Sequence, residues 1–545
     1  MSELLIKYED VPDGAAASTV ATCSDLQTFA SPTKMLDTAN EAPRTATFED
    51  DYWTLGEKMR LLPSDPASQS YGIFSKQQSC ADMTFETPIK LELELYALFS
   101  ATALSFEFDP VGPTWCSDMD VAWYHDDTLL YSGSYAPTTW QYTIEQPVVN
   151  FNKISIIFNA MSAPYRYLKV QSLAYGPTRR FTSREIRSLR YSPETDVLCD
   201  VLPVNNIEFE LKSANSSLIF QRKQRLELYD GDDFLGSFFV ETSTKKHGGF
   251  YDVKACDLLG LLDMASKYEG GMFDGAAAST VIPGIMGGVP YNLDPALASV
   301  PIKGWLPAAG RRASLQQFAF AVGGVVFTSG RKGISIAPLP ATPRSVIGNT
   351  RVYAGGELEQ SSFVTGVEVK ARSYKLGAET DELYSEKLNG TVKVEFSEPY
   401  GCLTVTGGTI VSQGVNYAVL SGTGSTVTLK GIKYSSTESL YSKENPDRNA
   451  ADADYVVSYN DMTLVSPVNV NSVLNHCYEL RKRTRTVKTK ALISGEKVGD
   501  FVGVWYDGDV LYGNIITMDY SISAKTAANI EVLIDDEYEV TNEHS

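Results

Sequence analysis

The sequence predicts a mainly β protein of several domains, in which a β-sandwich comes first and two related β-barrel domains follow with a small α/β domain. Three observations predict this fold class. At 545 residues the chain is too long for one hydrophobic core. Its apolar residues mostly alternate with polar ones, which is the period of a strand with one buried face. A pattern of strand, turn and strand also occurs twice, once in each predicted barrel.

The composition limits the classes to which the chain belongs. It is 43% hydrophobic and 21% charged, as in chains that bury cores throughout their length. No apolar stretch is long enough to cross a bilayer, and the first residues lack the basic and apolar regions of a secretion signal. The seven cysteines include no CxxC pair, which indicates reduced thiols from synthesis in a cytosol, without a zinc site or a disulfide framework.

The net charge of −20 argues against a nucleic-acid reader, because most of the surface would repel phosphates. One basic run occurs at residues 481–485. We interpret it as the end of a helix that runs into a strand, since cations favour a helix C-terminus. Contact with DNA is the alternative.

Residues 1–45 are rich in Ala, Ser, Thr and Asp without sustained periodicity, and we expect them to form an N-terminal arm. The octet at 13–20 recurs at 274–281, and we assign no function to this repeat.

Residues 46–176 are predicted to form a β-sandwich. Ile89, Leu91 and Leu93 alternate with charged residues, and similar runs recur between Pro, Gly and Asn breaks. Aromatic side chains in such a domain either stack on sugar rings or fill the core, and both interpretations stay open. The size and strand pattern resemble the galactose-binding-like jelly rolls of lectin modules. The candidate glycan contacts are Trp53, Trp115, Trp123 and Trp140.

Three regions follow a predicted boundary near Gly176, where Gly and Pro interrupt the strands. Residues 177–255 are predicted to form the first barrel and 256–345 the small α/β domain. Residues 346–545 are predicted to form the second barrel, with a β-rich insertion around 397–462.

Two helices are expected in these regions. Leu315, Phe318 and Val322 lie on one face of a helix that Gly323 would terminate. A second helix is expected to begin at Ser466-Pro467, with Ser as the N-cap residue.

The repeated pattern is an acidic glycine turn between two strands. Residues 229–239 align without a gap onto 506–516, and Gly236 matches Gly513. Turn chemistry alone can produce two such hairpins, but the matched glycines favour duplication. If two related barrels lie in one chain, a ring of three chains would present six similar barrels.

Over about residues 177–545 the chain resembles bacteriophage baseplate hub and tail-associated proteins. The resembling segments are 250–263, 304–307 with 312–320, 499–504 and 513–516. The resemblance implies a hub of two barrels in a homotrimeric ring at the virion tail tip, assembled in the host cytoplasm, which adapts a six-fold tail tube to a three-fold tip. The implied partners are the tail tube or distal tail protein, the tail spike or tip proteins and the tape measure protein. Host-surface glycans would contact the N-terminal domain during host attachment, and genome DNA would pass only in transit.

The sequence contains no recognisable catalytic site, and we expect a structural protein and not an enzyme. The four histidines lack metal-ligand spacing, and no nucleophile elbow, P-loop or complete dinucleotide-binding motif occurs. We therefore predict no catalytic residue, no cofactor and no metal. Two other classes stay open. One is a carbohydrate-binding adhesin. The other is a glycan-degrading enzyme, for which Asp126 with Asp127 or Asp230 with Asp232 would be the paired acids.

Overall fold

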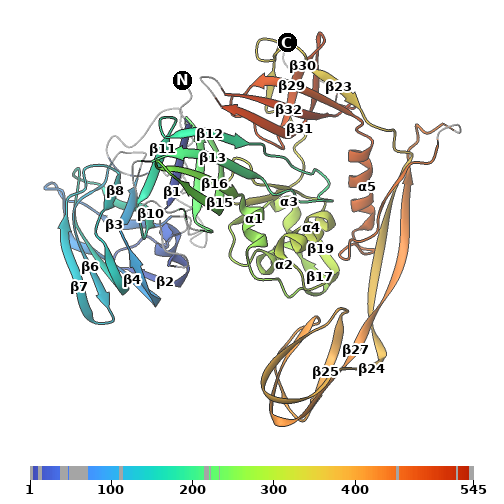
Figure 1. Cartoon of the computed structure of the whole chain (residues 1–545), viewed down its shortest axis with the longest axis horizontal. Helices are drawn as coiled ribbons and strands as arrows, with labels where there is room; N and C mark the ends of the chain where they lie inside the picture. The colour runs from blue at the N-terminus through green and yellow to red at the C-terminus, as the bar shows by residue number, and fades with distance from the viewer. Residues whose placement is uncertain are drawn as a thin grey trace.

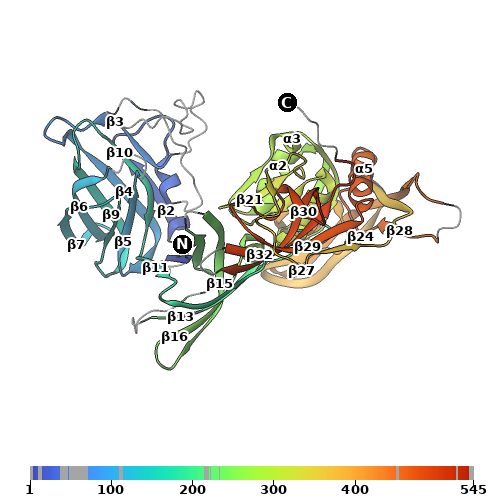
Figure 2. The same ribbon diagram turned by 90° about the horizontal axis from the view of Figure 1, so that it is seen from above.

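The computed structural model describes residues 4–9, 15–36, 47, 49, 71–109, 114–213, 220, 222–231, 233–449, 453–522 and 526–538. The chain is mainly β, which confirms the predicted fold class. The N-terminal sheets lie at one end of the molecule, two further large sheets lie beside one another, and a long hairpin projects away from them (Figure 1). The view from above separates the N-terminal sheets from the rest (Figure 2).

The N-terminal region contains two sheets that enclose one hydrophobic core. One sheet has the order β2-β4-β9-β6-β7 and the other the order β3-β10-β5-β8. The alternation at Ile89, Leu91 and Leu93 in β4 places all three side chains in this core, together with residues of the second sheet. The strands are β2 Thr19–Cys23, β3 Ile73–Gln78, β4 Thr84–Ala101, β5 Leu104–Phe108, β6 Cys116–His125, β7 Thr128–Tyr135, β8 Gln141–Ile144, β9 Val148–Met161 and β10 Tyr167–Ala174.

The segment expected to be an arm forms two strands. β1 (Leu4–Glu9) pairs with β14 on one side and β11 on the other, and β2 pairs with β4 of the sandwich. The reason is visible in β1, where Leu4, Ile6 and Tyr8 alternate with polar residues and are buried. The N-terminus therefore links the sandwich to the sheet that follows it.

That sheet has the order β11-β1-β14-β15-β16-β13-β12, and the last large sheet has the order β22-β30-β31-β32-β29-β23. The five strands that correspond are defined as the first module (β12 to β16) and the second module (β23 and β29 to β32). The strands are β11 Thr178–Thr182, β12 Ile186–Tyr191, β13 Asn206–Lys212, β14 Arg225–Asp230, β15 Asp233–Lys246, β16 Phe250–Cys256, β22 Ser345–Ile347, β23 Glu357–Gln360, β29 Arg485–Leu492, β30 Phe501–Tyr506, β31 Asp509–Ile522 and β32 Thr526–Ile534.

The two modules have the same topology. In chain order, their strands are β12, β13, β14, β15, β16 and β23, β29, β30, β31, β32. In space, both run from the third strand through the fourth, fifth and second to the first, with every pair antiparallel. They differ outside these strands, because β14 is flanked by antiparallel β1 and β30 by parallel β22.

Local irregularities repeat as well. The long fourth strand has a bulge between Val240 and Thr242 in β15 and between Ile515 and Thr517 in β31. Just before the bulge, the Val240 amide donates to Gln224 O at 2.9 Å, and the Ile515 amide donates to Asp500 O at 3.0 Å. Since bulges are characteristic features of a fold, their shared position supports duplication more strongly than the turn does.

At the turn, the structural alignment of the two modules is shifted by one residue from the ungapped sequence alignment. The first turn closes at Asp230 with Asp233, but the second closes at Tyr506 with Asp509, so Asp230 and not Tyr229 occupies the position of Tyr506. The matched glycines also differ in role. A Cβ on Gly513 would lie 2.1 Å from the Leu533 carbonyl oxygen, whereas one on Gly236 would meet side chains alone, with the ring of Phe238 nearest at 3.0 Å.

Between the modules lies a small α/β unit with its own core. Its elements are α1 Leu258–Asp263, β17 Gly271–Ala277, α2 Ala278–Met286, β18 Tyr291–Leu293, α3 Pro295–Ala298, β19 Pro301–Leu306, α4 Arg311–Val322, β20 Val325–Phe327 and β21 Ile334–Ala337. The predicted helix is α4, and Gly323 ends it in the left-handed conformation as expected.

An insertion separates β23 from β29 in the second module. Its long hairpin is formed by β24 (Gly366–Glu395) and β27 (Tyr417–Glu444), with β25 (Tyr400–Thr406), β26 (Thr409–Gln413) and β28 (Val456–Tyr459) beside them. The hairpin begins before the predicted insertion at 397–462. Helix α5 (Val470–Arg481) starts one turn later than predicted, because Asn469 Oδ1 accepts a hydrogen bond from the Ser466 amide and holds a turn there. The basic run does lie between this helix and β29.

Candidate functional site: the junction of the two modules

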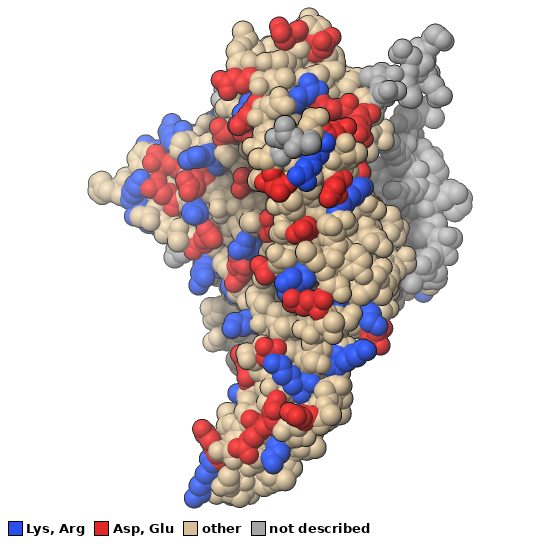
Figure 3. Space-filling model, turned by 90° about the vertical axis from the view of Figure 1, so that its right-hand side faces the viewer, with Lys and Arg blue, Asp and Glu red and all other residues tan. Residues whose placement is uncertain are grey.

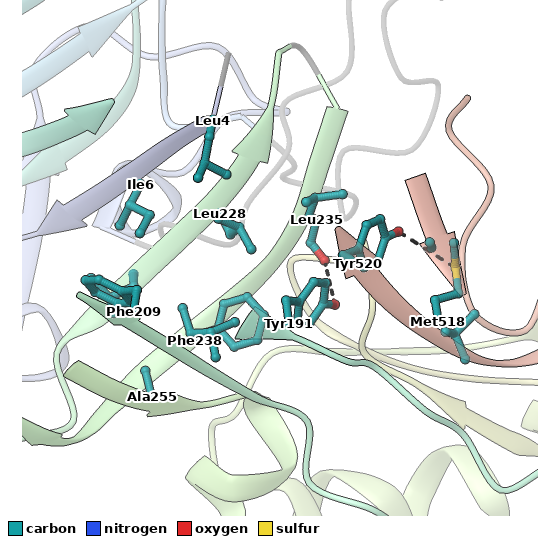
Figure 4. Close-up of a cluster of buried hydrophobic side chains, with 14 of the residues drawn as sticks. Leu4, Ile6, Tyr191, Phe209, Leu228, Leu235, Phe238, Ala255, Met518 and Tyr520 are labelled. Atoms are coloured by element: carbon teal, nitrogen blue, oxygen red, sulfur yellow. Dashed lines mark hydrogen bonds between the residues drawn. The ribbon is translucent and has the colours of Figure 1, made fainter. Parts of the chain in front are cut away.

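One hydrophobic core joins the two modules. Tyr191 at the end of β12 stacks on Tyr520 of β31, with ring centroids 5.3 Å apart and planes 12° apart. Tyr191 also contacts the edge of the Phe238 ring of its own module, and its hydroxyl donates to Leu235 O at 3.1 Å (Figure 4). Burial raises the pKa of both tyrosines, so neither ionises near neutral pH.

The main chain makes the second part of the junction. Past the end of β12, the Thr195 amide donates to Ile516 O at 2.9 Å, and the Met518 amide donates to Pro193 O at 2.9 Å. Glu194 and Thr517 therefore lie opposite each other as an antiparallel bridge. The first module thus adds a short strand to β31 at the bulge, along the side where its pairing with β30 has ended.

A turn of the α/β unit closes the junction. The Gly330 amide donates to Leu235 O at 2.8 Å, and Lys497 Nζ donates to Gly330 O at 2.9 Å, so residues 328–331 contact both modules. Thr328 Oγ1 donates to Asp257 Oδ2 at 2.7 Å. Burial raises the pKa of Asp257 to about 6, against the hydrogen bonds that it accepts.

The second module has a polar cluster near this turn. Arg351 Nη2 lies 2.7 Å from Glu496 Oε2, and Ser345 Oγ donates to Glu496 Oε1 at 2.8 Å. Although burial opposes ionisation of Glu496, hydrogen bonds from Arg351, the Ser494 amide and Ser345 together lower its pKa to about 2. The cluster ties β22 to the loop before β30.

The junction is head-to-tail. The first module contributes its edge strand β12 and the residues after it, while the second contributes its long fourth strand β31. β23 is the equivalent of β12, and β15 is the equivalent of β31. Each module therefore has both an edge strand that can be added and a long fourth strand that can receive one, and within the described part of the chain only β12 and β31 meet in this way. The remaining pair, β23 and β15, is therefore available for a contact of the same kind with another molecule.

The predicted glycan contacts are not brought together as one exposed platform. Trp123 is 2% exposed and lies in the sandwich core, so it cannot stack on a sugar, which corrects that assignment. Trp115 and Trp140 are half-buried against the same core, and Trp115 Nε1 donates to Pro137 O at 3.0 Å. Trp53 lies outside the described residues.

Two of the proposed acids, Asp126 and Asp230, accept hydrogen bonds from side chains of other strands. Asp126 stands in the turn between β6 and β7 and accepts a hydrogen bond from Asn152 Nδ2 at 2.7 Å. Asp230 accepts a hydrogen bond from Thr526 Oγ1, which ties the two modules together, and Asp232 lies outside the described residues. Within the described part of the chain, no group of three His, Cys, Asp or Glu side chains could hold a metal ion. His476 is half-buried, and desolvation lowers the pKa of its imidazole.

The junction was not found from the sequence. Residues 192–195 carry no apolar alternation, and their pairing with β31 is made by main-chain atoms, with one added side-chain hydrogen bond from Ser192 Oγ to Asp519 Oδ1. The one available signal was the pair of related hairpins, which indicated two modules without indicating how they meet.

Comparison with solved structures finds similar chains among phage tail proteins. The tail protein from Neisseria meningitidis MC58 is 10% identical with a TM-score of 0.41, over 66% of this chain and 94% of that one. Prophage tail protein gp18 from Listeria monocytogenes EGD-e is 11% identical with a TM-score of 0.39, over 65% of this chain and 91% of that one. A chain of the phage P2 baseplate in its activated conformation is 8% identical with a TM-score of 0.25, over 68% and 93%.

No family model and no curated protein matches the sequence. No helix in the described part of the chain is long and apolar enough to span a membrane.

Proposed function

We propose that the chain is a structural protein of a bacteriophage tail tip, a baseplate hub that forms a homotrimeric ring. The observation that carries the proposal is the head-to-tail junction of two modules of identical strand order. Repeating such a contact closes a ring when the rotation between modules is about 60°, and three chains then present six similar modules.

The insertions support a change of symmetry from six-fold to three-fold. Each chain supplies two modules, and in the described part of the chain the long hairpin of β24 and β27 is inserted in the second module alone (Figure 1). A ring of three chains would offer six similar modules to a six-fold tail tube and three hairpins to a three-fold tip. The proposed partners are therefore the tail tube or distal tail protein on one side, and the tail spike, tip and tape measure proteins on the other.

The charge pattern agrees with a conduit and not with a nucleic-acid reader. Acidic and basic side chains are interspersed over the face that includes the projecting hairpin (Figure 3). With a net charge of −20, the ring would let genome DNA pass in transit without holding it. We place the protein in the virion tail, assembled in the host cytoplasm, with no enzymatic role.

The domain assignment is part of the proposal. The sandwich, with jelly-roll character, precedes a hub formed by residues 177–255, 256–345 and 346–545. β1 of the N-terminal segment completes the first hub sheet.

The sandwich is a second candidate site, for contact with host glycans. β7 at the sheet edge exposes Leu129, Leu130 and Tyr131, and Trp115 and Trp140 are partly accessible in the same domain. Binding of the full chain to a host-glycan array, lost in the Tyr131→Ala or Trp140→Ala variant with an unchanged melting temperature, would support this role. An array without signal would reject it.

Sedimentation equilibrium of the full chain tests the ring. We expect the mass of three chains at micromolar concentration, with a single species over a tenfold concentration range. A dimer with two-fold symmetry would contradict the proposal, because it would present four modules and not six. A monomer at every concentration would also contradict it.

A further inference from the structure

We propose that residues 360–362 of one copy add as a strand to the β15 edge at residues 241–243 of the neighbouring copy. The number of copies that close the assembly rests on the proposed ring. The strand contact itself is inferred from the junction inside the chain. The occupant is a second copy of this chain, because the two surfaces left unused are the equivalents of the two surfaces that already bind each other.

The strand pairings define the equivalence. In the first module, Tyr191 lies opposite Ile207, which lies opposite Ala255 beside the bulge. In the second module, Leu358 of β23 lies opposite Val487 of β29, which lies opposite Val532 beside the bulge. Leu358 therefore takes the place of Tyr191. Counting on from these two residues places Gln360 at the position of Pro193 and Ser362 at that of Thr195.

The donor segment is exposed where its equivalent is covered. Pro193 is buried, whereas residues 359–363 are all exposed, including Phe363 at 41%. The Ser361 amide donates to Thr484 O at 2.8 Å, so alternation directs the amides of Gln360 and Ser362 away from β29. An edge strand with outward main-chain groups and an exposed aromatic side chain is a template for pairing with another chain.

Among the described residues, the acceptor edge is open in the same way. Pairing of β15 with β14 ends at Phe239, and the Lys223 amide then bonds Val240 O at 2.8 Å. Beyond that point, no strand of the described residues pairs with β15 on this side, whereas β31 at the equivalent place holds residues 193–195. Ser243 Oγ donates a hydrogen bond to Phe220 O. This bond is made by the side chain of Ser243 and not by its main chain.

Charge complementarity favours the same pairing. The acceptor hairpin carries Lys245 and Lys246 at exposed positions beyond the bulge, and the donor strand carries Glu357 and Glu359 at exposed positions. Within the chain Lys246 pairs with Asp252 and Glu210. Glu359 pairs with Lys488, so Glu357 is the acid that the contact between copies adds to Lys246. Opposite charges on neighbouring strands stabilise the pair, and they orient two copies before contact. Figure 2 shows the end of the β15–β16 hairpin projecting from the body of the molecule, where a second copy can reach it.

A matched pair of proline variants separates main-chain pairing from side-chain contact. Thr195 donates its amide in the internal junction, but Pro193 has no amide to donate. Ser362→Pro should therefore weaken association by about tenfold or more per interface, while Gln360→Pro should change it by less than about twofold. Equal effects of the two variants, measured by sedimentation at matched thermal stability, would overturn the pairing.

A disulfide between copies tests the register directly. The internal bridge of Glu194 and Thr517 is a non-hydrogen-bonded antiparallel pair, the kind in which side chains lie closest. Its equivalent between copies is Ser361 with Thr242. The experiment uses the full chain with Cys80→Ser and Cys402→Ser, since both native thiols are exposed, and adds Ser361→Cys with Thr242→Cys. The matched control carries Glu194→Cys with Thr517→Cys, which should close within one chain.

Mild oxidation should link the test variant into a closed species of three chains on a non-reducing gel. An open ladder of higher multiples would support the strand pairing but contradict the three-fold ring. Unlinked chains, with the control fully oxidised, would overturn the strand pairing. If such unlinked chains still sediment as trimers, the proposed ring stands and only this contact is wrong.

Discussion

The two modules share one strand order but differ in what covers their edges. In the first, the residues after β12 are paired with β31 and Tyr191 is buried between two rings. In the second, the residues after β23 are exposed, including Phe363. Natural proteins cover or charge the edges of their sheets, so an uncovered edge whose equivalent is covered indicates a missing neighbour. Neither module alone would have indicated that neighbour.

Breaking the covered junction should have the largest effect on stability. Tyr191→Ala removes a buried ring that contacts both modules and should lower the free energy of unfolding by about 4 kcal/mol in urea denaturation. Tyr96→Ala, at a side chain that is 84% exposed, is the control and should change it by less than about 0.5 kcal/mol. A small loss at Tyr191, similar to that of the control, would mean that the shared core does not hold the modules together.

The matched glycines should respond differently to the same change. Gly513→Ala would drive a Cβ into the Leu533 carbonyl and force the strands apart, with an expected loss of about 3 kcal/mol. Gly236→Ala meets side chains and no main-chain atom, with the ring of Phe238 nearest at 3.0 Å, so a smaller loss of about 1 kcal/mol is expected. Thermal unfolding of both variants measures the difference, and equal losses would refute the structural register.

The polar cluster of the second module should make the stability of the chain depend on pH. The pKa of Glu496 falls from 4.5 to about 2 on folding. Its contribution is therefore complete above pH 4.5 and is lost as the pH falls toward 2. Glu496→Gln should remove about 2 kcal/mol at about pH 7 and flatten the profile between pH 4.5 and 2. If Glu496→Gln lowered the free energy of unfolding equally at every pH, the ion pair with Arg351 would not be the source of the pH dependence.

The exposed edge should matter least to the stability of one chain. Phe363→Ser should change the free energy of unfolding by less than about 0.5 kcal/mol, because the Phe363 side chain is exposed in the single chain. The same substitution should reduce association between copies, as measured by sedimentation velocity. Strong destabilisation of the isolated chain would place Phe363 in an internal contact instead.

Much of the fold could be predicted from local pattern. Alternation located the sandwich strands, and the apolar face with Gly323 located α4. β1 was missed because it is a short alternation within a segment rich in small residues. Its burial depends on β11 and β14, which lie far along the chain.

The junction itself could not be predicted. Its strand pairing joins main-chain atoms of residues 193–195 and 516–518, and such pairing leaves no side-chain pattern. The side-chain bonds that accompany it, such as Thr526 to Asp230, join residues far apart in the sequence. The repeat was visible in the two turns, but its register was not, because Tyr-Asp-Gly-Asp aligns by composition while the bulges define the structural match. The candidate tryptophans show the same limit, since Trp123 in a core and an exposed Trp have the same sequence signal.

Imaging of the purified full chain by electron cryomicroscopy tests the central claim most directly. We expect a ring with six similar module densities, three projecting hairpins, and the same head-to-tail contact within and between chains. Particles with two-fold symmetry, or a ring in which β15 and β23 both face solvent, would contradict it.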